Sequence, residues 1–287
     1  MTGTEPSLRP GTSQSQELYL DLLMRVLTRS GFEERYRPLA GRRGVVGTAV
    51  RLSRRLLNGR GLDVVRIVDP AVTRRDRQEG RDLPPEAETM IGLRRLASLQ
   101  RCVAQVLHDD VPGDLLEAGV WRGGASIFMR AALKAFGAED RVVWVADSFQ
   151  GLPPPDPDRY PADADDPHWR IEGLAVSMGD VRANFAKYGL LDDQVKFLPG
   201  WFQDTLPSAP IDHLAVLRLD GDMYESTIVT LRALYPKVSP GGFVVVDDYG
   251  AVEGCRAAVD DFRAEHGIIE TMEEIDWTGR LWRRHPA

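Results

Sequence analysis

The feature that most constrains the fold of this chain is the alternation, from residue 86 onward, of short apolar runs with longer amphipathic segments. The apolar runs predict strands at 115–118, 142–146, 195–198, 212–219 and 243–246. The amphipathic segments predict helices at 86–108, 124–136, 176–189, 225–234 and 254–265. Such alternation predicts an α/β fold with a mostly parallel sheet and helices on both faces. IIETMEEI and GRLWRR predict two closing strands at the end of the chain, with an antiparallel strand at the sheet edge.

The region before this alternation divides into two parts. Residues 1–15 are polar and are expected to be disordered, whereas 16–85 form a helical, arginine-rich segment that begins with a helix at 18–32. The stretch RDLPPEAE marks the boundary to the Rossmann-like domain, 86–287.

Positive charge is concentrated in this segment. Between Arg35 and Arg81, thirteen arginines stand against four acidic residues, in a chain whose net charge is −7. The stretch VVGTAVRLSRRLL predicts a basic amphipathic helix. One interpretation is a helix packed on the main domain with a solvated arginine face. The other is contact with a phosphate-bearing substrate or an anionic membrane surface.

Composition excludes several classes of protein. The acidic net charge argues against general nucleic-acid binding. No apolar run approaches the roughly 18 residues that a membrane span requires, and the polar start lacks a signal-like core, so we expect a cytoplasmic protein. Cys102 and Cys255 are too few for a disulfide framework or a zinc site and are expected in the core.

The first two predicted strands lead into residues suited to a nucleoside. In DLLEAGVWRGGAS, Glu117 ends a strand, and Gly119 and Gly123 occupy the turn before a helix. Glycines at such a turn let the backbone approach a ligand, although many such turns are only tight connections. Asp147 ends the second strand, where a carboxylate can accept hydrogen bonds from ribose hydroxyls or cap the following turn. The pair Glu117 and Asp147 therefore suggests an adenosyl ligand.

Two later strands both end in aspartates, in LRLDGDMYEST and GGFVVVDDYG. If these strands are neighbours, Asp220 converges with Asp247 and Asp248 at one sheet edge. Three carboxylates in one cleft suit a hard cation such as Mg²⁺. The alternative is that they are solvated strand-end residues, which fits Asp222 and Glu225 better than Asp220.

The stretch QGLPPPDPDRYPADADDPHWR is too long for an ordinary connection. We interpret it as a flap, the alternative being a solvated acidic loop. It contains His168, a secondary candidate for a catalytic base.

Seven stretches in order resemble the macrocin O-methyltransferase family of TylF/MycF-type sugar methyltransferases: ETMIGLRRLASLQ, LLEAGVWRGGASIFMR, VADSFQGLPPPD, NFAKYGLLDDQVKFLPGWFQDTLP, LRLDGDMYEST, GGFVVVDDYG and IDWTGRLWRR. The resemblance covers roughly residues 85 to 285. It implies a class I fold dependent on S-adenosylmethionine (SAM), Mg²⁺, and a sugar hydroxyl as methyl acceptor. The acceptor could be a natural-product deoxysugar, a nucleotide sugar, a glycolipid or a polysaccharide.

Carried over by position, the resemblance implies that Asp220, Asp247 and Asp248 bind the metal, and Asp220 is also the first candidate for proton acceptor. The residues implied to line the cofactor are Glu117, Gly119, Gly123, Asp147, Ser148, Met90 and Trp201. With a sugar hydroxyl as acceptor, the flap is expected to lie over the acceptor site, and the arginine-rich segment 16–85 is a possible lid over the same site. A homo-oligomer is expected. The other activities that remain open are a metal-dependent catechol or phenol O-methyltransferase, an NAD-dependent oxidoreductase, and a noncatalytic nucleotide-binding protein.

Overall fold

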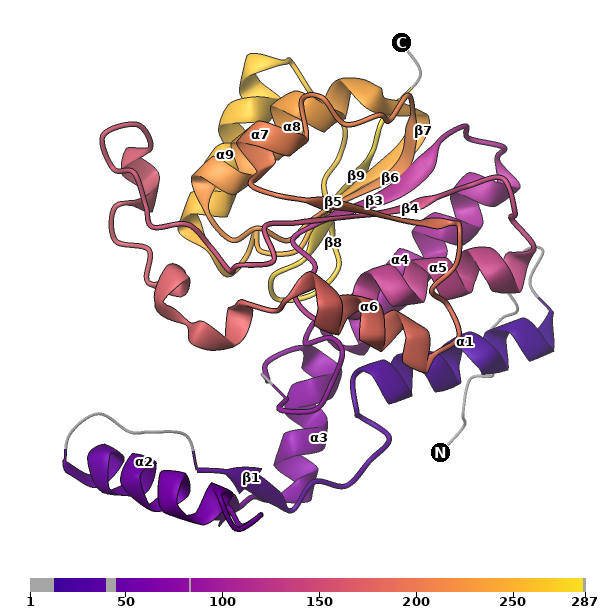
Figure 1. Cartoon of the computed structure of the whole chain (residues 1–287). Helices are drawn as coiled ribbons and strands as arrows, with labels where there is room; N and C mark the ends of the chain where they lie inside the picture. The colour runs from indigo at the N-terminus through magenta and orange to yellow at the C-terminus, as the bar shows by residue number, and fades with distance from the viewer. Residues whose placement is uncertain (1–12, 40–44, 83, 286–287) are drawn as a thin grey trace, which may run out of the picture.

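The computed structural model describes residues 13–39, 45–82 and 84–285. Its centre is a seven-stranded sheet in the order β5-β4-β3-β6-β7-β9-β8, in which the first five strands are parallel and β9 and β8 are antiparallel (Figure 1). The strands are β3 (Asp114–Ala118), β4 (Val143–Asp147), β5 (Val195–Pro199), β6 (Leu214–Leu219), β7 (Val238–Val246), β8 (Glu273–Glu274) and β9 (Arg280–Arg283). The predicted sheet, including both closing strands, is confirmed.

Helices cover both faces of the sheet, as the alternation predicts. One face carries α4 (Gly92–His108), α5 (Gly124–Phe136) and α6 (Met178–Lys187), with α1 (Gln14–Leu27) packed outside them. The other carries α7 (Phe202–Thr205), α8 (Tyr224–Leu234) and α9 (Glu253–Glu265). Alternate residues of one strand enter the two cores, as Leu115 and Leu116 do, because side chains of a strand point to opposite faces. Both cysteines are buried free thiols, as expected.

The start of α4 differs from the prediction. The helix begins at Gly92 rather than at residue 86. Residues just before it are taken up by main-chain contacts, because Glu88 N–H donates to Leu27 O (3.0 Å) and Glu88 O accepts from Gly124 N–H (2.9 Å). An extended segment wedged between α1 and α5 cannot at the same time satisfy the hydrogen bonds of a helical turn.

The N-terminal segment holds elements that the sequence pattern did not predict. A two-stranded antiparallel sheet, β1 (Tyr36–Pro38) with β2 (Val65–Ile67), flanks the predicted basic helix α2 (Val45–Asn58), and α3 (Pro70–Glu79) follows. Three-residue strands carry too little periodicity to be recognised. The helix predicted at 18–32 instead spans α1, for which Ser13 is the N-cap. The expectation of disorder for 1–15 is therefore wrong at residues 13–15, and its remainder lies outside the described residues.

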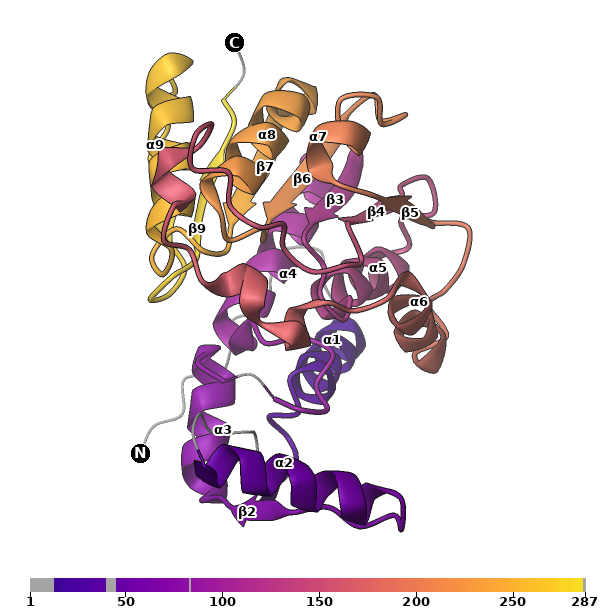
Figure 2. The same ribbon diagram turned by 60° about the vertical axis from the view of Figure 1, so that its left-hand side comes forward.

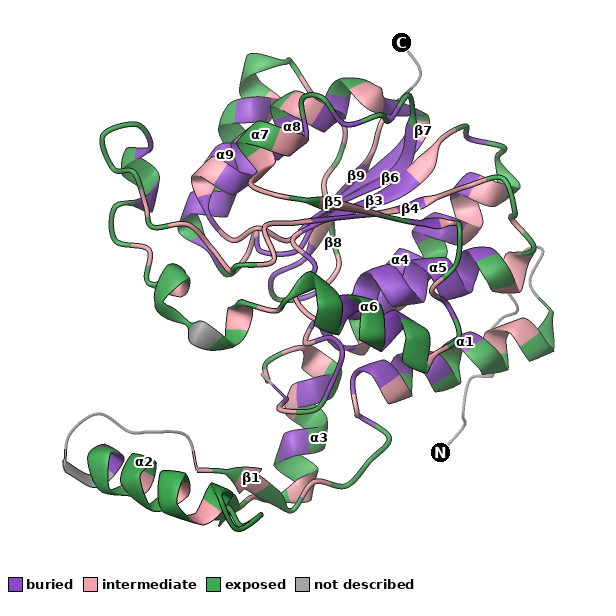
Figure 3. Ribbon diagram, viewed as in Figure 1, coloured by how far each residue is buried: buried purple, intermediate pink, exposed green. Residues whose placement is uncertain are grey.

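This segment projects from the main body. Figures 1 and 2 show α2, β1 and β2 held away from the seven-stranded sheet at the far end of α3. Figure 3 shows α2 mostly exposed. Among the described residues, no helix has the combined length and apolarity needed to cross a membrane.

Candidate active site

A cavity of about 370 Å³ lies at the carboxyl ends of the parallel strands. This is the edge at which open α/β sheets bind ligands, because the turns after neighbouring strands diverge there. The cavity brings together residues from the ends of β3, β4, β6 and β7, from the flap, and from the turn between β8 and β9. It is lined by nine of the ten predicted site residues: Met90, Glu117, Gly119, Asp147, Ser148, Trp201, Asp220, Asp247 and Asp248.

Gly123, the tenth, is not among the lining residues. It is the left-handed N-cap of α5, and a Cβ added there would lie 2.8 Å from Val181 Cγ1. The close approach that requires this glycine is therefore to α6. Gly123 is expected to contact the cofactor, but it does not line the cavity, so this contact stays a prediction.

Gly119 has a clear steric reason to be glycine. Its φ is +89°, and a Cβ would lie 1.9 Å from the carbonyl oxygen of Asp220. The turns that follow β3 and β6 therefore approach each other within backbone contact, which only glycine permits. This contact sets the position of Asp220 relative to the end of β3.

The acidic residues at the ends of β3 and β4 are held rigidly. Asp147 accepts hydrogen bonds from Val120 N–H and Phe149 N–H, both at 2.7 Å, and so fixes the turn after β3 as well as its own. Glu117 is buried, and its carboxylate contacts Arg218 Nη1 (2.5 Å) and Ser126 Oγ. Burial raises the pKa of Glu117 to about 7, and the Arg218 guanidinium opposes that shift.

Asp220, Asp247 and Asp248 converge as the sequence predicts. Each offers a carboxylate oxygen, and these three oxygens lie within 4.8 Å of one another. Burial raises the pKa of Asp220, and it raises that of Asp248 well above the usual range, with the neighbouring carboxylates adding to the effect at Asp248.

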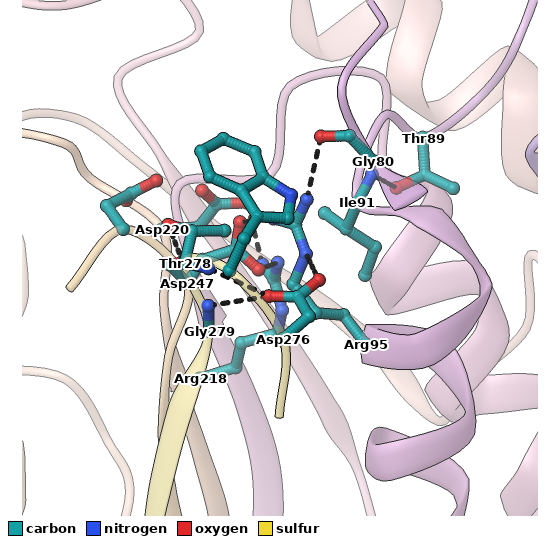
Figure 4. A network of polar contacts seen from close by, with 12 residues as sticks. Gly80, Thr89, Ile91, Arg95, Arg218, Asp220, Asp247, Asp276, Thr278 and Gly279 are labelled. Atoms are coloured by element: carbon teal, nitrogen blue, oxygen red, sulfur yellow. Dashed lines mark hydrogen bonds and ion pairs between the residues drawn. The ribbon is translucent and has the colours of Figure 1, made fainter. Parts of the chain in front are cut away.

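Two buried arginines hold this cluster together (Figure 4). Arg218, on β6, pairs with Glu117, Asp247 and Asp220, the last at 2.8 Å. Arg95, on α4, pairs with the other oxygen of Asp247 and with Asp276 (3.1 Å), and donates to Gly80 O at 3.1 Å. Both oxygens of Asp247 are thus engaged by guanidinium groups, whereas the hydrogen bonds of Asp220 and Asp248 engage one oxygen of each.

The donor set fits a divalent cation. The network contains five carboxyl groups, those of Glu117, Asp220, Asp247, Asp248 and Asp276, but only the two guanidinium groups of Arg95 and Arg218. Carboxylate oxygens are the ligands that Mg²⁺ prefers. An ion among the three oxygens of Asp220, Asp247 and Asp248 that lie within 4.8 Å of one another would offset part of the surplus negative charge of the network.

The flap is an ordered wall of the cavity. It contains two short 3-10 turns, at Pro161–Asp163 and His168–Arg170, and a third, Glu172–Leu174, directly follows it. The buried Asp163 carboxylate accepts from Tyr224 N–H (2.7 Å) and Glu225 N–H (2.9 Å), which caps the start of α8. The flap residues that line the cavity are Gly151, Leu152, Pro153 and His168, and they are joined there by Ile171 and Leu174 from the segment just after the flap. The alternative of a merely solvated loop is therefore wrong.

Asp222 and Glu225, which fit the alternative of solvated strand-end residues better than Asp220 does, are partly exposed and also line the cavity. Burial raises the pKa of Asp222 to about 7, with the Asp220 carboxylate as the next cause. His168 lines the same cavity and its Nδ1 lies 2.9 Å from Asp166 Oδ1.

Residues 16–284 match the model of a protein family described as macrocin O-methyltransferase (TylF). The chain belongs to this family. The enzyme is therefore a methyltransferase, and the predicted resemblance is confirmed.

Individual members of the family support the same assignment. The chain is 50% identical, over 96% of both sequences, to the 8-demethyl-8-(2,3-dimethoxy-α-L-rhamnosyl)-tetracenomycin-C 4′-O-methyltransferase of Streptomyces olivaceus. It is 52% identical to the mycinamicin III 3″-O-methyltransferase of Micromonospora griseorubida, over 76% of this chain and 87% of that protein. The solved structure of the O-methyltransferase NovP superposes with a TM-score of 0.79 at 47% identity, covering 94% of this chain and all of NovP.

The fold is that of class I SAM-dependent methyltransferases, as predicted. A calicheamicin methyltransferase, CalS11, shares this fold at 18% identity with a TM-score of 0.55. SAM is the cofactor of this fold, and the interpretation as a nicotinamide-dependent oxidoreductase is therefore wrong.

Sequence reasoning missed three residues of the candidate site: Arg95, Arg218 and Trp277. A signal for Arg218 was available, because an arginine inside the otherwise apolar run LAVLRL must be buried and must therefore find carboxylate partners. Arg95 and Trp277 lie in a helix and a turn whose local patterns give no such indication.

Proposed function

We propose that this enzyme transfers a methyl group from SAM to a hydroxyl group of a sugar carried by a natural product. The observation that carries the proposal is the cluster of Asp220, Asp247 and Asp248 in the same cavity as the acidic ends of β3 and β4. One cavity thus has one group of acids suited to a nucleoside and another suited to a metal and a hydroxyl acceptor. The relatives described above are named as O-methyltransferases of a rhamnosyl tetracenomycin and of mycinamicin III.

In this proposal the cofactor lies across the ends of β3 and β4. Asp147 lies at the end of β4, where its carboxylate would accept from the ribose hydroxyls of the cofactor. Further contacts are assigned to Met90, Glu117, Gly119, Ser148 and Trp201, which line this part of the cavity.

Asp220, Asp247 and Asp248 are assigned as ligands of Mg²⁺, which when bound would lower the pKa of the acceptor hydroxyl. Asp220 is positioned by Arg218 and by the backbone contact with Gly119, and it accepts the hydroxyl proton. The oxygen–methyl bond forms as the methyl–sulfur bond of SAM breaks, which leaves S-adenosylhomocysteine. Holding the hydroxyl, the methyl carbon and the sulfur in line supplies much of the rate acceleration.

The proposal is tested by incubating the purified enzyme with SAM and either mycinamicin III or the rhamnosyl tetracenomycin. We expect mass spectrometry to detect one added methyl group on the sugar of at least one of them. EDTA should abolish turnover, added Mg²⁺ should restore it, and calorimetry should show that S-adenosylhomocysteine still binds in EDTA. Full activity in EDTA would overturn the metal assignment. Methylation of simple catechols with neither glycoside modified would overturn the acceptor.

We also propose that the enzyme is a cytoplasmic homo-oligomer. The projecting segment exposes large apolar side chains on α2 and β2, among them Leu52 and Leu56 at 61% and 62% exposed, and Ile67 at 82%. This segment is basic, whereas the rest of the chain is strongly acidic. Apolar surface and opposite charge together favour association with the body of a second copy.

The role of the arginine-rich segment as an acceptor-site lid stays a prediction. Among its described residues, Gly80 is the one that lines the cavity of its own chain. Arg54 pairs instead with Asp63 at 2.6 Å.

A further inference from the structure

Trp277 is a partly exposed aromatic residue at the cavity that the proposed chemistry does not use. It is 38% exposed and lines the cavity together with its neighbour Thr278 and with Asp247 and Asp248. It occupies the turn between β8 and β9, the strands at the far edge of the sheet from β4.

The turn that carries Trp277 is rigid. Asp276 is buried, pairs with Arg95, and accepts from the N–H groups of Thr278 (3.0 Å) and Gly279 (2.8 Å). Thr278 Oγ1 donates to Asp247 O at 2.8 Å, which fixes the turn to the end of β7. Figure 4 shows Asp276, Thr278 and Gly279 beside Asp247 and Arg95. The backbone on both sides of Trp277 is therefore tied directly to the carboxylate cluster.

The indole itself is also held. Its Nε1–H donates to Glu79 O at 2.8 Å, and the Arg81 guanidinium carbon lies 4.3 Å from the ring centre. The backbone around Trp277 is fixed, one edge of the indole is hydrogen-bonded to Glu79, and the Arg81 guanidinium covers one face of the ring. The side chain therefore has little freedom to rotate. The exposed part of the indole is an apolar platform. Because the side chain is already held in one position, binding a ligand to it costs little additional side-chain entropy.

The order of strands places this platform on the acceptor side. Along the sheet edge the cavity presents first Asp147 and Glu117, then Asp220 and Asp247, and then the turn that follows β8. Trp121 and Trp201, the other tryptophans lining the cavity in the described part of the chain, follow β3 and β5 on the cofactor side. A hydroxyl at the carboxylates therefore belongs to a ring that can extend away from the cofactor toward Trp277.

We infer that the indole of Trp277 is the platform on which the acceptor sugar stacks through its apolar C–H face, and that Trp277 thereby determines specificity for deoxysugars. The inference rests on the proposed function. A deoxysugar ring presents more apolar surface than a fully hydroxylated one, and a flat aromatic face buries that surface without leaving polar groups unpaired.

Two substitutions separate stacking from a purely structural role. Trp277→Phe keeps an aromatic face but loses the N–H that binds Glu79 O, whereas Trp277→Gln keeps an N–H donor and loses the face. We expect the acceptor KM of Trp277→Gln to rise about tenfold or more and that of Trp277→Phe by less than about threefold. The affinity for S-adenosylhomocysteine, measured by calorimetry, should be unchanged in both. Trp169→Gln is the control, since Trp169 is 37% exposed in the flap but is not among the residues that line this cavity.

The assays use mycinamicin III and the rhamnosyl tetracenomycin as acceptors. An unchanged acceptor KM in Trp277→Gln, or an equal rise in both Trp277 variants, would overturn the inference while the wild type still methylates a glycoside. A wild type that methylates neither glycoside would instead overturn the proposed function and, with it, the inference.

Discussion

Among single residues, Arg218 is the one whose positive charge allows three acidic residues to lie close together at one buried edge of the sheet. The arginine is the penultimate residue of the buried strand β6, and its partners Glu117, Asp220 and Asp247 lie at the ends of the adjacent strands β3, β6 and β7. Carboxylates this close repel one another and favour protonation unless a cation lies among them. Arg218 therefore holds the carboxylates in place before any metal or substrate is bound.

The role of Arg218 is tested by Arg218→Met, which leaves three carboxyl groups without their partner. The free energy of unfolding, measured by urea denaturation, should fall by about 3–5 kcal/mol, because a broken buried ion pair leaves uncompensated charge. Arg101→Met is the matched control. Arg101 pairs with Glu273 at the surface, where such a pair contributes about 0–1 kcal/mol. Equal losses in the two variants would contradict the assigned role.

The three aspartates should differ in how their loss is rescued. Asp220→Asn removes a metal ligand and the proton acceptor together, so kcat should fall by more than about 10² and excess Mg²⁺ should not restore it fully. Asp248→Asn should weaken metal binding and recover in part as Mg²⁺ is raised. Asp247→Asn should also lower stability, because it leaves Arg95 and Arg218 underpaired. Full rescue of Asp220→Asn by Mg²⁺ would contradict its role as base.

At the scale of elements, the flap and α8 stabilise each other. Asp163 supplies the cap that α8 lacks from its own N-cap residue, Met223, and the rings of Tyr160 and Tyr224 pack with centroids 5.9 Å apart. Gly254, in α9, leaves room for this contact, since a Cβ there would lie 2.8 Å from Asp163 Oδ1. One acidic side chain thus connects the flap to both helices on this side of the cavity.

The substitution Asp163→Ala should remove the hydrogen bonds that connect the flap to the start of α8. We expect the free energy of unfolding to fall by about 0.5–2 kcal/mol, as for other lost caps, and trypsin to cleave the flap at Arg159 and Arg170 faster than in the wild type. Asp165→Ala, at an exposed position of the same flap, is the control and should change neither property. Unchanged cleavage rates in Asp163→Ala would show that other contacts hold the flap.

At the scale of the whole molecule, the charge and the apolar surface of the projecting segment stand out. The stretch 35–81 carries a balance of +9, so the remainder of the chain carries −16. Internal pairs such as Arg37 with Glu34 (2.7 Å) neutralise part of this charge, but α2 keeps an exposed face. A surface of this kind gives self-association both a hydrophobic and an electrostatic component.

Self-association through α2 predicts a specific response to substitution and salt. Sedimentation velocity should show an oligomer for the wild type and a monomer for the double variant Leu52→Glu, Leu56→Glu, with S-adenosylhomocysteine affinity unchanged. Replacing Arg51, Arg54 and Arg55 by Gln should weaken association and reduce its sensitivity to salt. The exposed pair Leu18 and Leu22 in α1 provides the matched control, in which glutamates should leave the oligomer intact. A monomeric wild type would contradict the proposal.

Local sequence patterns are enough to predict the sheet, its covering helices and the convergence of acidic residues at one edge of the sheet. Periodicity is a local property, and the carboxyl ends of parallel strands meet at one edge whatever lies between them. For this reason Asp220, Asp247 and Asp248 could be placed together before the structure was known.

The cations that pair with these acidic residues, and the residues that surround them, could not be predicted from such patterns. Arg218 and Glu117 are 101 residues apart in sequence, and Arg95 and Asp247 are 152 apart. Such pairs depend on strand register and helix docking, which local patterns do not encode. The cap of α8 by Asp163 and the position of Trp277 beside the carboxylates have the same origin, because each joins segments that become neighbours only after the chain has folded.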